Sequence, residues 1–180
     1  VSQEGTDALP EAQLDRFLFK LLLDYPTEAE EIGMVQRWGR IMEAPEVSVV
    51  SSGDELLGLR QAVNQVHVAD TVQAYIVSLV RATRIRAAGG AAPVEGEFRD
   101  LAFGASPRAC LGLYQASKAL AWLRGHDYVT PALVQEICVD VMRHRIGLTY
   151  EAEARGLTAD RILGEILVNT PVPESAPGPR

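Results

Sequence analysis

The most constraining feature of this sequence is the stretch GASPR (residues 104–108) and the apolar run that follows it. Ser106 is a good N-cap, because its hydroxyl can accept a hydrogen bond from an otherwise unpaired backbone N–H group. Pro107 falls at the first helical position, where its missing N–H group has no cost. Gly125 suits the position just after a helix end. The pattern therefore predicts a helix from Pro107 to about Arg124.

Arg108 is placed in the first turn of this helix, beside the positive end of the helix dipole. The dipole favours an anion there by about 0.3–1 kcal/mol, so a cation is unusual at this position. One interpretation is an exposed arginine in a capped first turn, and the local pattern by itself favours it. The other is that an anion such as a phosphate docks on the free N–H groups together with Arg108.

Most of the remaining chain also has a helical pattern. Thr27 and Glu30 have the spacing of a capping box, and Pro45 ends the helix that they begin. Apolar residues recur at intervals of three and four in four further segments, which are 52–66, 69–86, 131–142 and 159–168. We expect a loop over 87–96, which contains three glycines, and a disordered tail over 170–180, which contains four prolines.

The N-terminal part of the chain differs from the rest. Residues 10–16 have the pattern of a short helix with Pro10 in its first turn, and residues 17–23 are a compact apolar run closed by Asp24-Tyr25-Pro26. A run of that length between turn signals favours a buried strand, although its periodicity does not separate a strand from a helical segment. The chain is therefore expected to be mostly α, a helical bundle preceded by a short strand-bearing segment.

Composition places the chain among soluble globular proteins. It is 47% hydrophobic and 23% charged, which is ordinary for that class. Its net charge of −7 argues against a general surface for nucleic acid or for anionic membranes. No apolar run reaches the roughly 18 residues that span a bilayer, and no signal peptide is visible. Cys110 and Cys138 are isolated within helical patterns, so we expect two buried, reduced thiols in a cytoplasmic protein.

Two motifs carry a family resemblance. LPEAQLDRF (residues 9–17) and GASPR (residues 104–108) resemble, in sequence and order, two motifs of the MoxR family of AAA+ ATPases. In that family the first motif carries the arginine finger and the second carries the sensor 2 arginine. Residues 4–6, 129–131 and 144–145 also match the family pattern in the same order, so the resemblance covers residues 3 to 150.

The resemblance implies a domain organisation. Residues 1–24 would be the C-terminal end of the αβα nucleotide-binding core, with the finger helix and the last core strand, and residues 25–169 would be the α-helical AAA+ lid domain. The sequence contains no G-x-x-x-x-G-K-[ST] loop and no apolar strand ending in Asp-Glu, which lie upstream in relatives. We therefore expect the C-terminal half of such an ATPase, inactive alone. Without its sheet, the strand over 17–23 would refold, pair with a second chain or stay mobile.

The resemblance also implies roles for three residues. From charge alone, Arg16 would pair with Asp15 or Glu11 on a solvated helix. The motif match favours instead an arginine finger that acts in trans, on the γ-phosphoryl charge of ATP bound by a neighbouring subunit. Arg108 would be sensor 2 in cis, coupling nucleotide state to lid angle. Tyr25, at the presumed hinge between core and lid, would lie near the adenine or simply pack.

Other candidate residues have simpler interpretations. Arg81, Arg84 and Arg86 cluster at the end of one predicted helix, where the dipole favours cations, and contact with a neighbouring subunit or the core is the alternative. His144 stands between two arginines. We expect it to cap a helix end rather than to act as a pH switch.

Several partners follow from the resemblance. The full-length protein would bind ATP and Mg²⁺, neither of them held tightly by this chain alone. It would form a homo-oligomeric, hexameric ring that remodels or assembles client proteins, such as those with a von Willebrand A domain, without nucleic acid or membrane partners. The alternative is a non-catalytic helical protein-interaction module. A helix-turn-helix regulator of DNA is disfavoured by the acidic charge balance.

Overall fold

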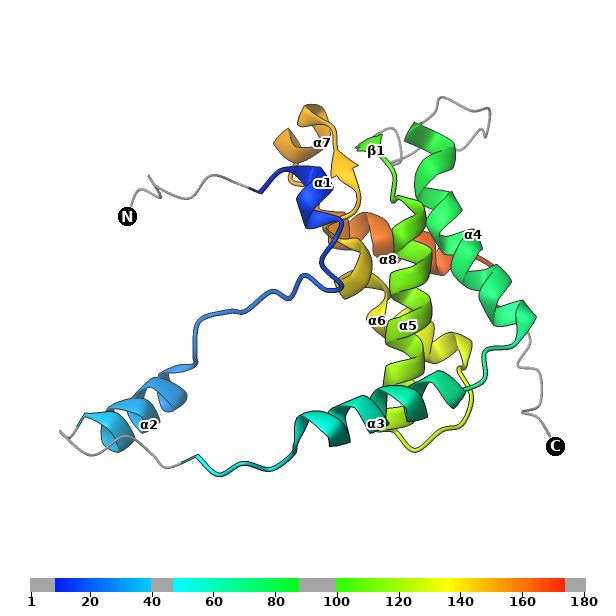
Figure 1. Ribbon diagram of the computed structural model, residues 1–180. Helices are drawn as coiled ribbons and strands as arrows, with labels where there is room; N and C mark the ends of the chain where they lie inside the picture. The colour runs from blue at the N-terminus through cyan, green and yellow to red at the C-terminus, as the bar shows by residue number, and fades with distance from the viewer. Residues whose placement is uncertain (1–8, 40–46, 88–99, 174–180) are drawn as a thin grey trace. The chain divides into compact units, whose positions relative to one another are not determined.

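The computed structural model describes residues 9–39, 47–87 and 100–173. The chain divides into two compact units, of which one joins Val1–Lys20 to Gln61–Arg180 and the other is Leu21–Arg60. Helices dominate both units (Figure 1). The expectation of a mostly α fold is therefore confirmed.

The unit of Leu21–Arg60 contains helix α2 (Glu28–Trp38) and the start of helix α3 (Gly53–Gln65). The predicted capping box of α2 is present, because the Glu30 carboxylate accepts from the Thr27 backbone N–H group at 2.8 Å and the Thr27 hydroxyl accepts from the Glu30 N–H group. No residue of α2 is buried. Pro45, predicted to end this helix, lies outside the described residues.

The other unit is built on four long helices, which are α4 (Asp70–Ala87), α5 (Pro107–Leu123), α6 (Pro131–Met142) and α8 (Ala159–Asn169) (Figure 1). Helix α5 packs against α4 and α6, and both of these contact α8. The hydrophobic core lies between the four helices and includes the fully buried side chains Leu79, Leu113, Val134, Met142 and Ile162. Burial of such side chains is the main favourable term in folding.

The helix starts agree with the sequence pattern. The Ser106 hydroxyl accepts from the Arg108 N–H group, and Thr130 and Thr158 cap α6 and α8 in the same way. Gly125 has a φ of +73°, a left-handed conformation that glycine adopts without steric cost. These contacts lie within a few residues in sequence, which is why the pattern alone predicts them.

A small sheet and a short helix were not anticipated. Strand β1 (Leu101–Phe103) pairs antiparallel with β2 (Gly147–Leu148), and helix α7 (Tyr150–Ala154) follows. The strands are too short to show the alternation of apolar and polar residues on which strand prediction depends. The pair connects the segment before α5 to the segment after α6.

The expected strand over residues 17–23 is corrected by the structure. Helix α1 (Glu11–Leu14) is present, but residues 17–23 form no strand, and the Leu23 side chain is 93% exposed. A strand needs a neighbour for its backbone groups. Within the described ranges the only sheet is β1–β2, so the segment has no strand to pair with, and the Lys20 N–H group instead donates to the Asp140 carbonyl at 3.0 Å.

The remaining expectations fall partly outside the described residues. Helix α4 reaches Ala87, and the rest of the predicted loop, as well as 174–180 of the predicted tail, is not described. The domain boundaries at residues 24 and 169 stay predictions. Cys138 is buried, whereas Cys110 is only partly so, which corrects the expectation of two buried thiols. In the described part of the chain, every helix is too short or too polar to cross a membrane.

Candidate functional site

The loop that precedes α5 is fixed against α4. A Cβ atom on Gly104 would lie 2.5 Å from the Thr83 carbonyl oxygen, so only glycine allows this approach of the two backbones. The Ala105 N–H group donates to the buried Thr83 hydroxyl at 2.9 Å, and Arg84 Nε donates to the Ala105 carbonyl at 2.6 Å. The N-terminus of α5 is therefore held in one place, and Arg84 has a structural contact of its own beyond the expected interaction with the helix dipole.

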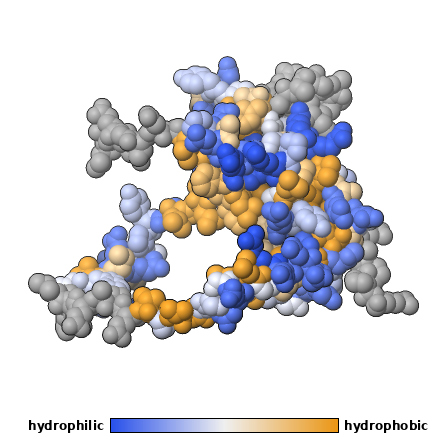
Figure 2. All heavy atoms as spheres, viewed as in Figure 1, coloured by the Kyte–Doolittle hydropathy of each residue, from blue (hydrophilic) through white to orange (hydrophobic). Residues whose placement is uncertain are grey.

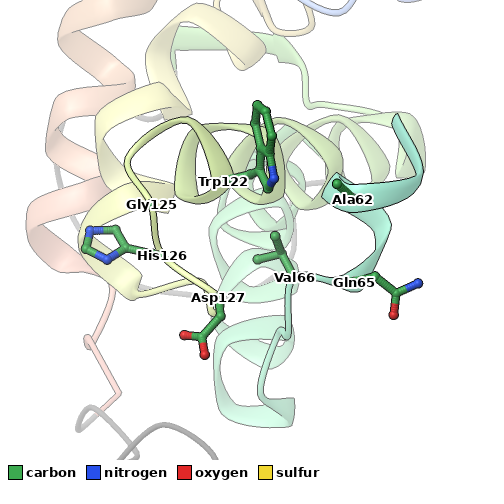
Figure 3. Close-up of a pocket in the computed structure, with 7 residues that line it drawn as sticks. All are labelled: Ala62, Gln65, Val66, Trp122, Gly125, His126 and Asp127. Carbon is green, nitrogen blue, oxygen red and sulfur yellow. The ribbon is translucent and has the colours of Figure 1, made fainter. Parts of the chain in front are cut away.

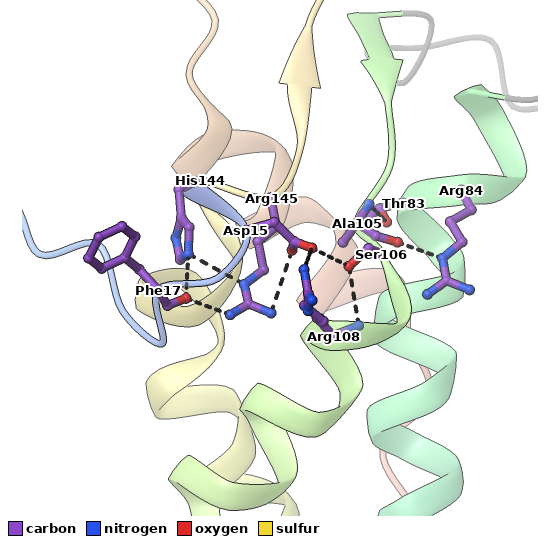
Figure 4. A network of polar contacts seen from close by, with 9 residues as sticks. All are labelled: Asp15, Phe17, Thr83, Arg84, Ala105, Ser106, Arg108, His144 and Arg145. Atoms are coloured by element: carbon purple, nitrogen blue, oxygen red, sulfur yellow. Dashed lines mark hydrogen bonds and ion pairs between the residues drawn. The ribbon is translucent and has the colours of Figure 1, made fainter. Parts of the chain in front are cut away.

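The N-terminus of α5 binds a carboxylate from a distant part of the sequence. The Ser106 hydroxyl donates to Asp15 Oδ2 at 2.8 Å, and Arg108 Nη1 lies 3.7 Å from the same oxygen (Figure 4). A helix N-terminus favours an anion through its free N–H groups and dipole. Asp15 thus stands in the position where the sequence predicts that an anion docks beside Arg108.

A second cation completes this cluster. Arg145 is buried, its Nη1 lies 3.8 Å from Asp15 Oδ1, and its Nη2 donates to the Phe17 carbonyl at 2.6 Å (Figure 4). Burial lowers the pKa of the Arg145 guanidinium, while Asp15 opposes this shift and Arg108 adds to it. An arginine stays protonated at neutral pH. Arg145 is therefore a buried positive charge that depends on Asp15 and the Phe17 carbonyl for compensation.

His144, the neighbour of Arg145, contacts the same carbonyl. Its Nε2 lies 3.0 Å from the Phe17 oxygen and 3.4 Å from Arg145 Nε, so the same ring nitrogen faces both a hydrogen-bond acceptor and a donor. The Nδ1 atom is buried without a partner, and burial lowers the pKa of His144. The expectation that His144 caps a helix end is corrected, since its partner belongs to the segment after α1.

A further contact holds that segment to the C-terminal end of α6. Arg143 Nη1 donates to the Lys20 carbonyl at 2.7 Å, and the same guanidinium binds both carboxylate oxygens of Asp160 at 2.9 Å. It also lies 2.8 Å from Asp140. The hydrogen bonds that Arg143 donates to Asp160 are the main cause of its raised pKa. Residues 15–20 are therefore docked on α5 and α6 by three consecutive side chains, Arg143 to Arg145.

Two of the site residues predicted from the sequence, Arg16 and Tyr25, are not part of the cluster around Asp15. Arg16 is exposed, and its side chain has no hydrogen bond or ion pair to any described residue. The pairing of Arg16 with Asp15 or Glu11 that charge alone suggests is therefore not formed, since Asp15 faces Arg108 and Arg145. Tyr25 is 95% exposed and belongs to the other unit.

Sequence reasoning missed Asp15 and Arg145 as members of the site. The sequence pattern relates Asp15 only to its neighbour Arg16, and it indicates Arg145 only as part of the pair 144–145 that matches the family pattern. The signal that could have pointed to them is that each is a charged residue inside a stretch that matches the family pattern, residues 9–17 and 144–145. Neither stretch, however, indicates that the two charges meet.

Two hollows lie elsewhere on the same unit. One, of about 280 Å³, is lined by Trp122, His126, Asp127 and the end of α3 (Figure 3). The other has a similar volume and a mainly apolar lining that includes Val77 and Leu111. Figure 2 shows that apolar and polar side chains are interspersed over the visible surface. The described residues contain no group of three His, Cys, Asp or Glu side chains that could hold a metal ion.

Comparisons with known proteins identify the fold and the family. Residues 98–166 match the family model of the AAA lid domain. The chain is 38% identical over 174 residues to the chaperone MoxR1 of Mycobacterium tuberculosis and 30% identical over 164 residues to the protein MoxR of Paracoccus denitrificans. These alignments cover 97% and 86% of this chain, and 45% and 48% of the relatives.

A solved structure is similar over the same extent. The crystal structure of a candidate ATPase from Cytophaga hutchinsonii has a TM-score of 0.86 and 36% identity, and the match covers 97% of this chain and 52% of that one. The chain belongs to the MoxR family of AAA+ proteins. It spans about half the length of the MoxR relatives that it matches. The α5 N-terminus with Ser106 and Arg108 lies within the AAA lid domain of this MoxR-family chain.

Proposed function

We propose that this chain is the lid and arginine-finger part of a MoxR-type AAA+ ATPase, which couples ATP binding and hydrolysis to chaperone-like remodelling or assembly of partner proteins. The observation that carries the proposal is the carboxylate of Asp15 on the N-terminus of α5, between Ser106 and Arg108. A site that already holds one anion with a helix N-terminus and an arginine is chemically suited to a phosphate.

Arg108 has the properties that sensor 2 requires. Its side chain is 58% exposed, and its ion pair with Asp15 is long at 3.7 Å. Ion pairs of this kind contribute about 0–1 kcal/mol, so Arg108 can leave Asp15 for a phosphate at little cost. We assign Arg108 to the γ-phosphate of ATP bound by its own subunit, where the planar guanidinium would bind two phosphate oxygens.

Arg16 has the properties of an arginine finger. Its side chain is exposed and has no partner among the described residues, although Arg145 forms an ion pair with Asp15 before it and a hydrogen bond to Phe17 after it. Such an arginine is available to a second subunit, where it would stabilise the charge that develops on the transferred phosphoryl group. This role in trans requires a ring of subunits, which we propose to be a homo-hexamer.

The nucleotide and the partners belong to the full-length protein. ATP would supply the γ-phosphate that Arg108 and Arg16 contact. Mg²⁺ would neutralise part of the phosphate charge and would be held by residues outside this chain. Tyr25 stays a candidate for the vicinity of the adenine. We propose client proteins as the partners, among them proteins with a von Willebrand A domain, and a cytoplasmic location. Two of the relatives are named protein MoxR, and a third is named chaperone MoxR1.

ATP turnover by the full-length protein tests this proposal. We expect Arg16→Ala and Arg108→Ala each to lower kcat by at least tenfold, because each removes a cation from the transition state. Equal mixtures of the two variants should recover part of the turnover, since one acts in trans and the other in cis. Arg124→Ala, which removes an exposed arginine paired with Glu136 at the other end of α5, is the matched control and should have no effect.

The competing function is a non-catalytic helical interaction module. The apolar hollow beside the exposed side chains Val77 and Leu111 is the observation in its favour. Turnover that is absent from the full-length protein, or that is equal in the parent and both arginine variants, would support this module and contradict the ATPase proposal.

A further inference from the structure

We propose that Arg145, together with Asp15, positions Arg16 for its action on a neighbouring subunit, although Arg145 itself lies in the AAA lid domain. The inference rests on the proposed role of Arg16 as an arginine finger. Arg145 would then be a positioning residue, which contacts neither ATP nor Arg16 but holds the backbone that carries Arg16.

The geometry places both neighbours of Arg16 on one guanidinium. Arg145 Nη1 faces the Asp15 carboxylate at 3.8 Å, and Nη2 donates to the Phe17 carbonyl at 2.6 Å (Figure 4). One planar group thus contacts the residue before Arg16 through an ion pair and the residue after it through a hydrogen bond. A lysine could not do so, because a single ammonium group cannot reach both positions from one place.

Arg145 is itself held firmly. Only 3% of its side chain is exposed, and it lies against Gly112 of α5, where an added Cβ atom would stand 3.5 Å from the guanidinium nitrogens. Helices α5 and α6 are in direct contact here, since the same Cβ atom would lie 3.1 Å from Val141. A buried guanidinium packed against α5 keeps one orientation, and a reactive group must be placed to within a fraction of an ångström to act.

The role of Arg145 is separable from that of Arg108. Both arginines lie at similar distances from Asp15, 3.7 Å for Arg108 and 3.8 Å for Arg145, but the Arg108 side chain is 58% exposed and that of Arg145 only 3%. The Ser106 hydroxyl donates to the same carboxylate at 2.8 Å. When Arg108 turns to a phosphate, Asp15 therefore keeps Ser106 and Arg145 as partners. The segment with Arg16 stays docked while Arg108 changes its ligand. Arg145 should consequently act with Arg16 in trans, and not with Arg108 in cis.

Mixing variant subunits of the full-length protein distinguishes residues that act in trans from residues that act in cis. Arg145→Met should lower kcat about tenfold to a hundredfold, as expected for a misplaced catalytic group, with the KM for ATP unchanged within twofold. Mixed with Arg108→Met, it should recover turnover, because the Arg108 variant donates an intact finger to the site of the Arg145 variant. Mixed with Arg16→Ala it should recover none, since both variants lack a working finger.

Additional variants keep the test independent of folding. Asp15→Asn retains the hydrogen bond to Ser106 but loses the charge that faces Arg145, and it should behave in mixing as Arg145→Met does. Arg145→Lys should stay defective despite its charge. Arg124→Met is the matched control with an exposed arginine. Binding of a fluorescent ATP analogue, measured without turnover, should be weakened by Arg108→Met and unchanged in the Arg145 and Asp15 variants.

The outcomes separate this inference from the proposed function. If the Arg145 and Asp15 variants are rescued by Arg16→Ala and not by Arg108→Met, they act in cis and the positioning role is overturned. The same holds if they retain full turnover while Arg16→Ala loses it, in which case the ATPase function stands. If neither Arg16→Ala nor Arg108→Ala changes turnover, the proposed function itself fails, and the positioning role fails with it.

Discussion

The Asp15 carboxylate contacts three groups that lie far from it in the sequence, namely Ser106, Arg108 and Arg145. A buried arginine is costly unless its charge is compensated, because the interior solvates charge poorly. Asp15 supplies the compensating charge, and the Phe17 carbonyl supplies a hydrogen bond. The residues on both sides of Arg16 are therefore part of the charge balance of the helical bundle.

His144 makes this cluster sensitive to pH. Burial lowers its pKa below the ordinary value of 6.5, Arg145 and Lys20 lower it further, and the contact with Phe17 and the charge of Asp15 act in the opposite direction. The unfolded chain therefore binds a proton at a higher pH than the folded protein does. Stability is fully present above 6.5 and is lost as the pH falls from there through the folded pKa.

Replacement of His144 tests this prediction. In His144→Gln the amide still donates to the Phe17 carbonyl but does not titrate. We expect the free energy of unfolding, measured with urea between pH 7 and pH 5, to fall less steeply with decreasing pH in the variant than in the parent. An equal or steeper fall in the variant would contradict the burial of neutral His144.

At the scale of elements, α4 and the loop before α5 form the support of the site. The backbones of Gly104 and Thr83 are in contact, and hydrogen bonds from Ala105 and Arg84 connect the loop to α4. The N-cap of α5 follows directly at Ser106. A displacement of this loop would move the N-terminus of α5, and with it both Arg108 and Ser106, which contact Asp15.

Gly104→Ala should consequently destabilise the protein. Its Cβ atom would meet backbone atoms of α4 at 2.5 Å, and overpacking of this kind costs about 1–3 kcal/mol. The matched control is Gly164→Ala within α8, where a Cβ atom meets nothing within 4 Å. This change should stabilise the helix by about 0.5–1 kcal/mol, because alanine loses less conformational entropy than glycine. Urea unfolding of both variants measures the difference, and equal effects would contradict the close approach.

At the scale of the whole molecule, the chain is an AAA lid domain with a docked N-terminal segment and a second compact unit. It matches about half of each MoxR relative and contains no G-x-x-x-x-G-K-[ST] loop. Phosphate binding in such ATPases depends on the backbone N–H groups and the lysine of that loop. In their proposed roles, Arg16 and Arg108 would stabilise phosphate charge only when that loop is present.

The isolated chain of 180 residues should therefore show no ATP turnover. Release of inorganic phosphate, measured at micromolar protein, should equal that of buffer with Mg²⁺ and ATP alone. The full-length protein at the same concentration is the control. Turnover by the isolated chain that Arg108→Ala abolishes would contradict the assignment of the nucleotide site to residues outside this chain.

The sequence alone predicts the four long helices α4, α5, α6 and α8, and it indicates the family. The starts of α5, α6 and α8 follow from a Ser or Thr cap, with a proline next in two of them, and the end of α5 follows from Gly125. These signals are readable because each depends on hydrogen bonds between residues a few positions apart. The two motifs at residues 9–17 and 104–108 identified the family, which the comparisons confirmed.

The surroundings of the candidate site become visible in the three-dimensional structure alone. It showed that Asp15 faces Arg108 and Arg145 rather than Arg16, that His144 binds the Phe17 carbonyl, and that residues 17–23 form no strand. Contacts between residues about 90 to 130 positions apart leave no periodic pattern in the sequence. They depend on how the helices pack, and a strand depends on whether a neighbour is present to accept its hydrogen bonds.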